Sequence, residues 1–425
     1  MTGASTTSDG AAKDGGPAGT PGPSRRGFLR GGATFLGGAL GGTAVTLSGT
    51  AALGAPEHTP EHTPGRAPAA DQAGRATVAF RGPRQPGVDT TPQGFATFLA
   101  LDLAGGTDRE ALVRLMRIWT DDAERLMSGR PGLTDTEPEL AAVPARLTVT
   151  VGYGSAVFTA AALAHRAPSW LRPLPSFGVD RLEENWSGGD LLLQVCADDP
   201  VTVSHAVRVL VRQARTFARP RWLQRGFRHS PGTVPPGTTW RNPMGQVDGT
   251  GNIDPTAEPH LVWHEDDGSG WLAGGTSVVV RRIAMDLDGW DEVDRTGREN
   301  TIGRRLSDGA PLTGSDEHDE PDLEATGPNG FGVIDAAAHV RRSRTDDPGQ
   351  RFLRRPYGYD DGPGDSGLVF VTYQADVDRQ FLPVQRRLDE LDLLNEWTTP
   401  IGSAVFAVPP GAGPDEYLGQ ALLEG

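Results

Sequence analysis

The sequence predicts an α+β protein built from two similar units, and three observations support this prediction. Short segments that alternate apolar and polar residues, or that are rich in β-branched residues, indicate strands. Longer segments with apolar residues at spacings of three and four indicate amphipathic helices. Strands separated by helices occur in two successive stretches, so we expect two sheets that each carry helices on one face.

The elements of the first unit follow from the spacing of their apolar residues. Segment 108–126 carries leucines, a methionine and a tryptophan at helical spacing, and valines recur in the same way along 200–217. We therefore expect helices at 108–126 and 200–217 and strands at 95–103, 147–153 and 190–197.

The second unit repeats this arrangement. Segment 275–287 is rich in β-branched residues, which favours a strand. Further strands are expected at 366–374 and 403–408, with a helix at 377–391. The acidic stretch 315–324 and the Gly/Pro-rich stretch 356–367 are expected to be loops, with the acidic side chains in solvent.

The N-terminus has the features of an export signal. Ser24-Arg25-Arg26-Gly27-Phe28-Leu29 is a twin-arginine motif, and a weakly hydrophobic Gly/Ala-rich run follows it. We expect a twin-arginine signal peptide at 1–55, which leaves no stable membrane span after cleavage. A Pro/Ala-rich linker is expected at 56–75. It repeats Glu-His-Thr-Pro around His58 and His62, but a flexible tail is a poor metal site. The predicted domains are then 76–235 and 236–425.

Composition excludes several classes of protein. The net charge of −15 argues against a nucleic-acid partner and against an anionic membrane surface. The chain has one cysteine, Cys196, which excludes internal disulfides, thiolate zinc sites and iron–sulfur clusters. Covalent haem attachment through Cys-x-x-Cys-His is excluded too, so any haem must be bound without a covalent link.

The segment 244–252 contains the first candidate for chemistry, Asp248. It lies in Gly245-Gln246-Val247-Asp248-Gly249-Thr250-Gly251-Asn252, where glycines permit tight turns and close approach of a flat ligand. A carboxylate held there can act as an acid or base. The alternative is an ordinary Asp-Gly turn. A calcium loop is excluded because Ile253 and Pro259 stand where such a loop needs glycine and a bidentate glutamate.

Two later segments contain histidine and arginine. His339 follows three alanines and precedes Arg341, Arg342 and Arg344, so it could be a haem ligand with arginines on the propionates, or a structural histidine. In Arg351-Phe352-Leu353-Arg354-Arg355-Pro356-Tyr357, the apolar pair would draw a neighbouring arginine inward. These patterns leave open whether Arg354 or Arg355 has a functional role.

Seven segments, in this order along the chain, resemble the dye-decolorising (DyP-type) haem peroxidases, specifically the twin-arginine-exported EfeB-like deferrochelatase/peroxidase branch. Residues 245–250 match the family's GxxDG motif, 338–341 resemble the segment of the proximal ligand, and 352–355 resemble that of the distal arginine. The other segments are 147–154, 187–200, 302–312 and 380–385. The resemblance covers nearly all of the mature chain.

This resemblance implies a fold and a set of site residues. The fold would be two ferredoxin-like domains in a dimeric α+β barrel-like arrangement, with non-covalent haem b in the second domain. His339 would be the proximal iron ligand with a carboxylate behind it, and Asp248 and Arg354 would lie on the distal side. The remaining cofactor contacts would be Arg341 and Arg344 at the propionates, Gly249, Thr250 and Gly251 at the haem edge, and Leu368 and Phe370 narrowing the distal pocket.

The resemblance also implies an activity. Hydrogen peroxide would be cleaved with the help of the Asp248/Arg354 pair, through an oxoferryl intermediate that oxidises dyes, phenols or other one-electron donors, or a partner redox protein. Two alternatives remain open: a deferrochelatase that releases iron from haem, and a haem-binding or electron-transfer protein without turnover. The twin-arginine signal predicts an extracellular, cell-wall or periplasmic location.

Overall fold

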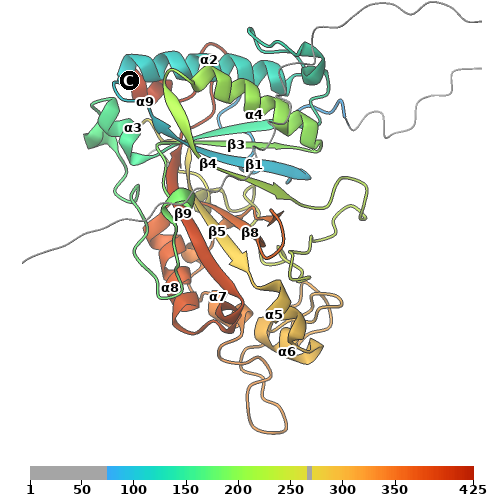
Figure 1. Cartoon of the computed structure of the whole chain (residues 1–425). Helices are drawn as coiled ribbons and strands as arrows, with labels where there is room; N and C mark the ends of the chain where they lie inside the picture. Colours follow the sequence, from blue (N-terminus) through green and yellow to red (C-terminus); the bar gives the residue numbers. More distant parts are fainter. Residues whose placement is uncertain (1–73, 266–269) are drawn as a thin grey trace, which may run out of the picture. The chain divides into compact units, whose positions relative to one another are not determined.

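An antiparallel sheet of nine strands forms the centre of the protein. It appears in a computed structural model that describes residues 74–265 and 270–425 (Figure 1). The predicted signal peptide, His58 and His62 lie outside these residues. Within the described residues, no helix is long and apolar enough to cross a membrane.

The first half of the sheet follows the predicted order of elements as far as α4 (Pro200–Ala214), and β4 (Ala218–Phe227) comes after them. Helices α2 (Arg109–Met127) and α4 lie along the outer face of its strands (Figure 1). Asp108 caps α2 by accepting a hydrogen bond from Ala111 N at 2.9 Å, and Asp199 caps α4 through Thr202 N at 2.7 Å. The strands, in spatial order, are β2 (Thr148–Tyr153), β3 (Leu191–Ala197), β1 (Phe95–Leu103) and β4.

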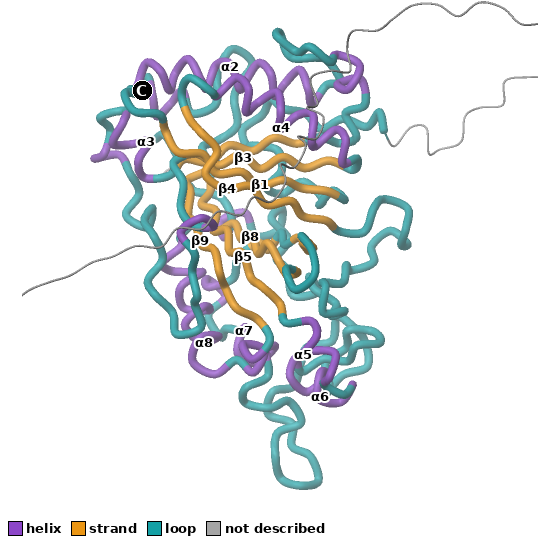
Figure 2. The backbone as a smooth tube through the Cα atoms, viewed as in Figure 1, coloured by secondary structure: helices purple, strands orange, loops and turns teal. Residues whose placement is uncertain are grey.

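The second half has longer connections. Figure 2 shows that the chain between α6 and α7 is loop. The strands are β5 (Thr276–Met285), β6 (Leu353–Arg354), β7 (Tyr357–Asp360), β8 (Ser366–Gln374) and β9 (Thr398–Val408). The helices are α5 (Leu287–Glu292), α6 (Arg295–Ile302), α7 (His339–Ser343) and α8 (Leu382–Leu391). Two short helices, α3 (Ser155–Ala160) and α9 (Gln420–Leu423), complete the fold.

The two halves close into a barrel. The strand order is β5-β9-β2-β3-β1-β4-β7-β8-β6, and β5 also pairs with β8, which completes a ring. Each seam between the halves is a single pair of residues, Tyr153 with Ala407 and Phe227 with Gly358. The predicted ferredoxin-like pair of domains in a barrel-like arrangement is thereby confirmed.

Strand alternation separates an interior from an outer face. Residues such as Phe98, Trp222, Tyr373 and Phe406 belong to one buried cluster inside the barrel. Their neighbours on the same strands belong to a second cluster, which includes the apolar faces of α2 and α4. A third, smaller cluster lies on the outer face of β5 and β8 against α5 and α6, and this face carries the candidate site.

Several local predictions need correction. The stretch 356–367, predicted to be loop, contains β7, because Tyr357 and Tyr359 point into the barrel. The predicted strand 275–287 ends at Met285, where Asp286 caps α5. The predicted helix 377–391 begins as one π-helical turn. The elements that were not predicted also include β4, β6, α3, α5, α6, α7 and α9. The acidic stretch 315–324 is loop, but it is not wholly solvated, because Glu317 accepts hydrogen bonds from protein side chains.

Candidate functional site

Asp248 stands at the end of a small hairpin. Arg241 pairs with Val247 across a turn at Gly245, whose φ of +79° suits glycine. Asp248 N donates to Trp240 O at 2.9 Å, and Asn242 Nδ2 lies 3.4 Å from Asp248 Oδ2. Asp248 itself lies between two turns, one closed by Gly245 N on Asn242 O and one by Asn252 N on Gly249 O. Its side chain is only 13% exposed.

Arg354 contacts this carboxylate from β6. Its Nη1 donates to Asp248 Oδ1 at 3.1 Å. Arg355 points the other way, because consecutive residues on a strand face opposite sides. Its guanidinium is buried inside the barrel and donates to Thr90 O and to Gln93 Oε1. The geometry therefore distinguishes two arginines that the sequence could not.

His339 is the first residue of α7, and a buried carboxylate holds it. Its Nδ1 lies 2.6 Å from Asp392 Oδ2, and the Asp392 side chain is 3% exposed. This contact occupies Nδ1 and leaves Nε2 as the nitrogen that can bind a metal. Backbone bonds fix the arrangement, since Leu393 N donates to Ala337 O at 2.9 Å.

The three predicted residues share one electrostatic environment. Burial lowers the pKa of His339, but the charge and hydrogen bond of Asp392 raise it by more, so the net direction is upward. The charges of Arg354 and Asp248 also act on this imidazole. The imidazole of His339 thus lies within electrostatic range of the Asp248–Arg354 pair, although 91 residues separate His339 from Asp248 in sequence (339 − 248). Leu368 and Phe370 follow on the same face of β8, in the apolar cluster of Trp240 and Met244.

The glycine-rich segment after Asp248 makes fewer contacts. Gly249 has a φ of +141°, which a residue with a Cβ rarely adopts. A Cβ at Gly251 would meet open space. The Thr250 hydroxyl donates to Glu317 Oε1 at 2.9 Å, and the Thr239 hydroxyl donates to the same oxygen. Glu317 thus connects segment 248–252 to the acidic loop 315–324 through its hydrogen bond with Thr250.

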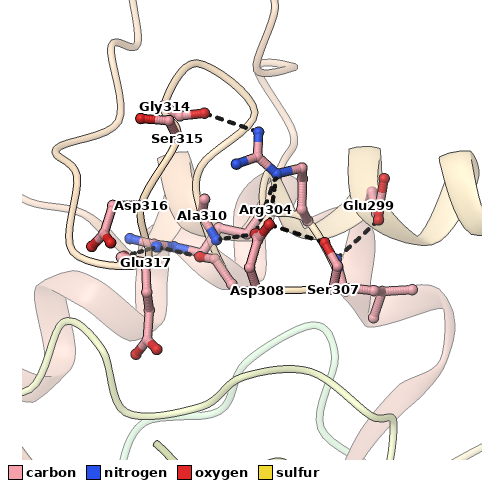
Figure 3. Close-up of polar contacts among 12 residues, drawn as sticks. Glu299, Arg304, Ser307, Asp308, Ala310, Gly314, Ser315, Asp316 and Glu317 are labelled. Carbon is pink, nitrogen blue, oxygen red and sulfur yellow. Dashed lines mark hydrogen bonds and ion pairs between the residues drawn. The ribbon is translucent and has the colours of Figure 1, made fainter.

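Arginines line the neighbouring loop. Arg344 forms an ion pair with Glu320. The Arg341 guanidinium donates hydrogen bonds to the carbonyls of Leu323 and Ile334, so part of its donor capacity is used within its own loop. Arg304 donates to Gly309 O at 2.7 Å and to Glu317 O at 2.8 Å, in the segment drawn in Figure 3. Burial lowers the pKa of both Arg304 and Arg344.

Sequence reasoning did not assign four residues at this site. Asp392 was expected only as an unspecified carboxylate, and Arg304 only as part of a matching segment. The Arg228 guanidinium lies 4.6 Å from the centre of the Trp240 ring, and burial lowers its pKa to about 10. Asn252 bonds to the backbone of Arg354. The contacts of Asp392 with His339 and of Asn252 with Arg354 join parts of the chain 53 and 102 residues apart, which no local pattern marks.

The donor set of the site fits a haem. A single imidazole with a free Nε2 and a carboxylate behind Nδ1 is the ligand arrangement that haem iron takes from a protein. Arg344 would offer a cationic group to a propionate, and Leu368 and Phe370 would offer apolar surface to a porphyrin.

Family models match both halves of the chain. The model described as Dyp-type peroxidase, C-terminal, matches residues 239–413, and the one described as Dyp-type peroxidase, N-terminal, matches residues 85–228.

Individual relatives agree with these matches. A dye-decolorizing peroxidase of Thermobifida fusca is 39% identical, over 95% of this chain and 98% of its own. A deferrochelatase of Yersinia pestis is 34% identical, over 81% and 84%. Two solved structures each cover 83% of this chain and 99% of their own. One is a DyP-type peroxidase from Cellulomonas bogoriensis, with 60% identity and a TM-score of 0.82. The other is ferric DtpA from Streptomyces lividans, with 44% identity and a TM-score of 0.80.

Proposed function

The chain belongs to the Dyp-type peroxidase family, and on that premise we propose that Asp248 and Arg354 activate hydrogen peroxide beside a haem held by His339. Membership of this family shows that the protein is a peroxidase and that its cofactor is haem. The observation that carries the residue assignment is the contact between Arg354 Nη1 and Asp248 Oδ1 at 3.1 Å.

Each residue has a distinct task in this proposal. The bound haem supplies an iron centre that exchanges electrons with peroxide and with the reducing donor. His339 Nε2 would hold the iron, and Asp392 orients the imidazole through Nδ1. Asp248 takes the proton that peroxide loses and returns it to the oxygen that leaves as water. Arg354 stabilises the negative charge that develops as the O–O bond breaks.

The cofactor's other contacts follow from the surrounding loops. Gly249, Thr250 and Gly251 would contact the edge of a bound haem, and Leu368 and Phe370 would offer it apolar surface. Arg344 is the propionate partner that we favour over Arg341, because Arg341 is bonded to carbonyls of its own loop. Dyes, phenols or a partner redox protein deliver the electrons.

Rapid mixing with peroxide tests the distal pair. We expect Asp248→Asn to slow the reaction about 10²–10⁴-fold, because the proton relay is lost. Arg354→Leu should slow it roughly 10²–10³-fold, because charge stabilisation is lost. Asp254→Asn and Arg130→Leu, both at exposed positions, serve as matched controls. Wild-type rates in both Asp248→Asn and Arg354→Leu would refute the assignment.

The absorption spectrum tests the iron ligand separately. His339→Ala should lose haem during purification, with a weakened and shifted Soret band. A variant with full haem occupancy and an unchanged Soret band would exclude His339 as the ligand.

Release of iron from haem is a second candidate function, which the similarity to the Yersinia pestis deferrochelatase favours. It would use the same pocket and the same iron ligand. Incubation of the protein with excess haem, followed by fluorescence detection of iron-free protoporphyrin, separates the two activities. Dye oxidation with no detectable protoporphyrin identifies a peroxidase alone.

A further inference from the structure

The side chain of Asn252 bonds to the backbone of Arg354 through both ends of its amide. Asn252 Nδ2 donates to Arg354 O at 2.8 Å, and Asn252 Oδ1 accepts from Arg354 N at 2.8 Å. This two-bond pattern is the one that a residue of a neighbouring antiparallel strand makes with its partner. Asn252 therefore takes the place of a missing strand.

The backbone of Arg354 needs such a partner. Strand β6 has two residues and lies at the end of the strand order, and among the strands of residues 74–265 and 270–425 only β8 pairs with it. Arg355 N donates to Val371 O of β8 at 2.8 Å, and the polar groups of residue 354 point to the opposite side. Without Asn252, the N–H and C=O of Arg354 would lose these partners, and the position of its Cα would be less well defined.

The same loop holds Asp248. Asn252 N donates to Gly249 O at 2.9 Å, which closes a turn directly after Asp248. This turn is therefore joined to β6 twice, by the carboxylate to the guanidinium and by the Asn252 amide to the backbone of Arg354. A long arginine side chain reaches a fixed point reliably only if its Cα is fixed.

We propose that Asn252 is a positioning residue that sets the distance between the Arg354 guanidinium and Asp248. This inference rests on the proposed catalytic role of Arg354. An amide is required because it offers one donor and one acceptor side by side, which alanine lacks and an ionised aspartate supplies only in part.

The test uses the haem-loaded protein and two readouts, the affinity of the ferric form for fluoride and the rate of its reaction with peroxide. Fluoride binds at the iron and accepts hydrogen bonds from distal groups, so its affinity reports their placement without turnover. We expect Asn252→Ala to lower both quantities about tenfold or more, with haem occupancy unchanged. Asn329→Ala, which alters an amide that accepts from Phe331 N in an exposed turn, should leave both unchanged.

Two further variants show whether Asn252 acts through Arg354. In an Arg354→Leu background, Asn252→Ala should cause no additional loss. Asn252→Asp keeps the acceptor and regains a donor only when its carboxyl is protonated. Its fluoride affinity relative to wild type should therefore recover toward pH ~4, near the reference pKa of aspartate.

The outcomes separate this inference from the proposed function. Wild-type fluoride affinity and rate in Asn252→Ala, with a slow Arg354→Leu, would overturn the positioning role alone. The positioning role would also be overturned if Asn252→Ala lowered the fluoride affinity and the peroxide rate as much in the Arg354→Leu background as in the wild type. Wild-type behaviour of Arg354→Leu itself would overturn both.

Discussion

The carboxylate of Asp392 connects His339 to the start of a 3₁₀ turn. Its Oδ2 lies 2.6 Å from His339 Nδ1, while its Oδ1 accepts from Leu394 N at 3.1 Å. One buried side chain thus orients the imidazole and begins the segment that leads into β9. Asp392 therefore fixes both the charge behind the proposed iron ligand and the local backbone.

Replacing Asp392 with asparagine should raise the reduction potential of the haem iron. The ferric state is the more positive one, so removing a negative charge behind its ligand destabilises it. A 10–100-fold loss in the relative stability of the ferric state corresponds to about 60–120 mV for one electron. Spectroelectrochemical titration of the variant checks this, with Asp389→Asn on the nearby helix α8 as the control. An unchanged potential would contradict the charge effect.

Gly303→Ala should lower the free energy of unfolding, because the added Cβ meets α7, the helix that begins with His339. Gly303 ends α6 with a φ of +84°, and an added Cβ would lie 2.5 Å from Val340 Cγ1 on α7. Strain alone costs about 1–3 kcal/mol. Gly330→Ala is a matched control, since its φ is +76° and its Cβ would meet open space. Thermal unfolding should show the larger loss for Gly303→Ala, and equal losses would show that contact with α7 is unimportant.

Asp122→Asn should stabilise the protein at neutral pH. Burial raises the pKa of Asp122, although hydrogen bonds from Gln213 and Leu133 lower it in part. A carboxyl with a raised folded-state pKa costs stability while it is ionised, and this cost disappears as pH falls through that pKa. We expect a gain within about 1 kcal/mol at pH 7 that disappears in acid. Unfolding curves at both pH values measure it, and an equal gain in acid would contradict the explanation.

Export provides a prediction for the N-terminal segment. If 1–55 is a twin-arginine signal, Arg25→Lys with Arg26→Lys should leave the protein in the cytoplasm, because the export machinery recognises the arginine pair. Cell fractionation and immunoblotting measure this, with Arg30→Lys as the control. Continued export of the double variant would contradict the proposed route.

The fold was largely predictable wherever apolar residues recur at one period. Strand β1 was predicted with its observed bounds, because its alternating pattern has no competing signal. Strand β4 was missed because its buried positions include Gln224 and Gly226 while arginines occupy exposed ones. The seams that close the barrel were not predictable, since each depends on a single pair of residues far apart in the chain.

The residues of the candidate site could be proposed from the sequence, but their geometry could not. His339, Asp248 and Arg354 were chosen from motifs. Their partners could not be chosen in this way, because contacts such as Asn252 with Arg354 span 102 residues. The choice between Arg354 and Arg355 depends on which of them points into the barrel. That direction follows from the pairing of β6 with β8, which the sequence does not show.

The position of β9 has a consequence for how the protein is made. This strand is the last in the chain, yet it lies between β5 and β2 and so joins the second half of the barrel to the first. A ribosome releases the N-terminal end first, and residues up to 408 must emerge before the ring can close. Asp392 also emerges late, well after His339. Both the closed barrel and the contact of Asp392 with His339 therefore form only after the C-terminal segment 392–408 has emerged.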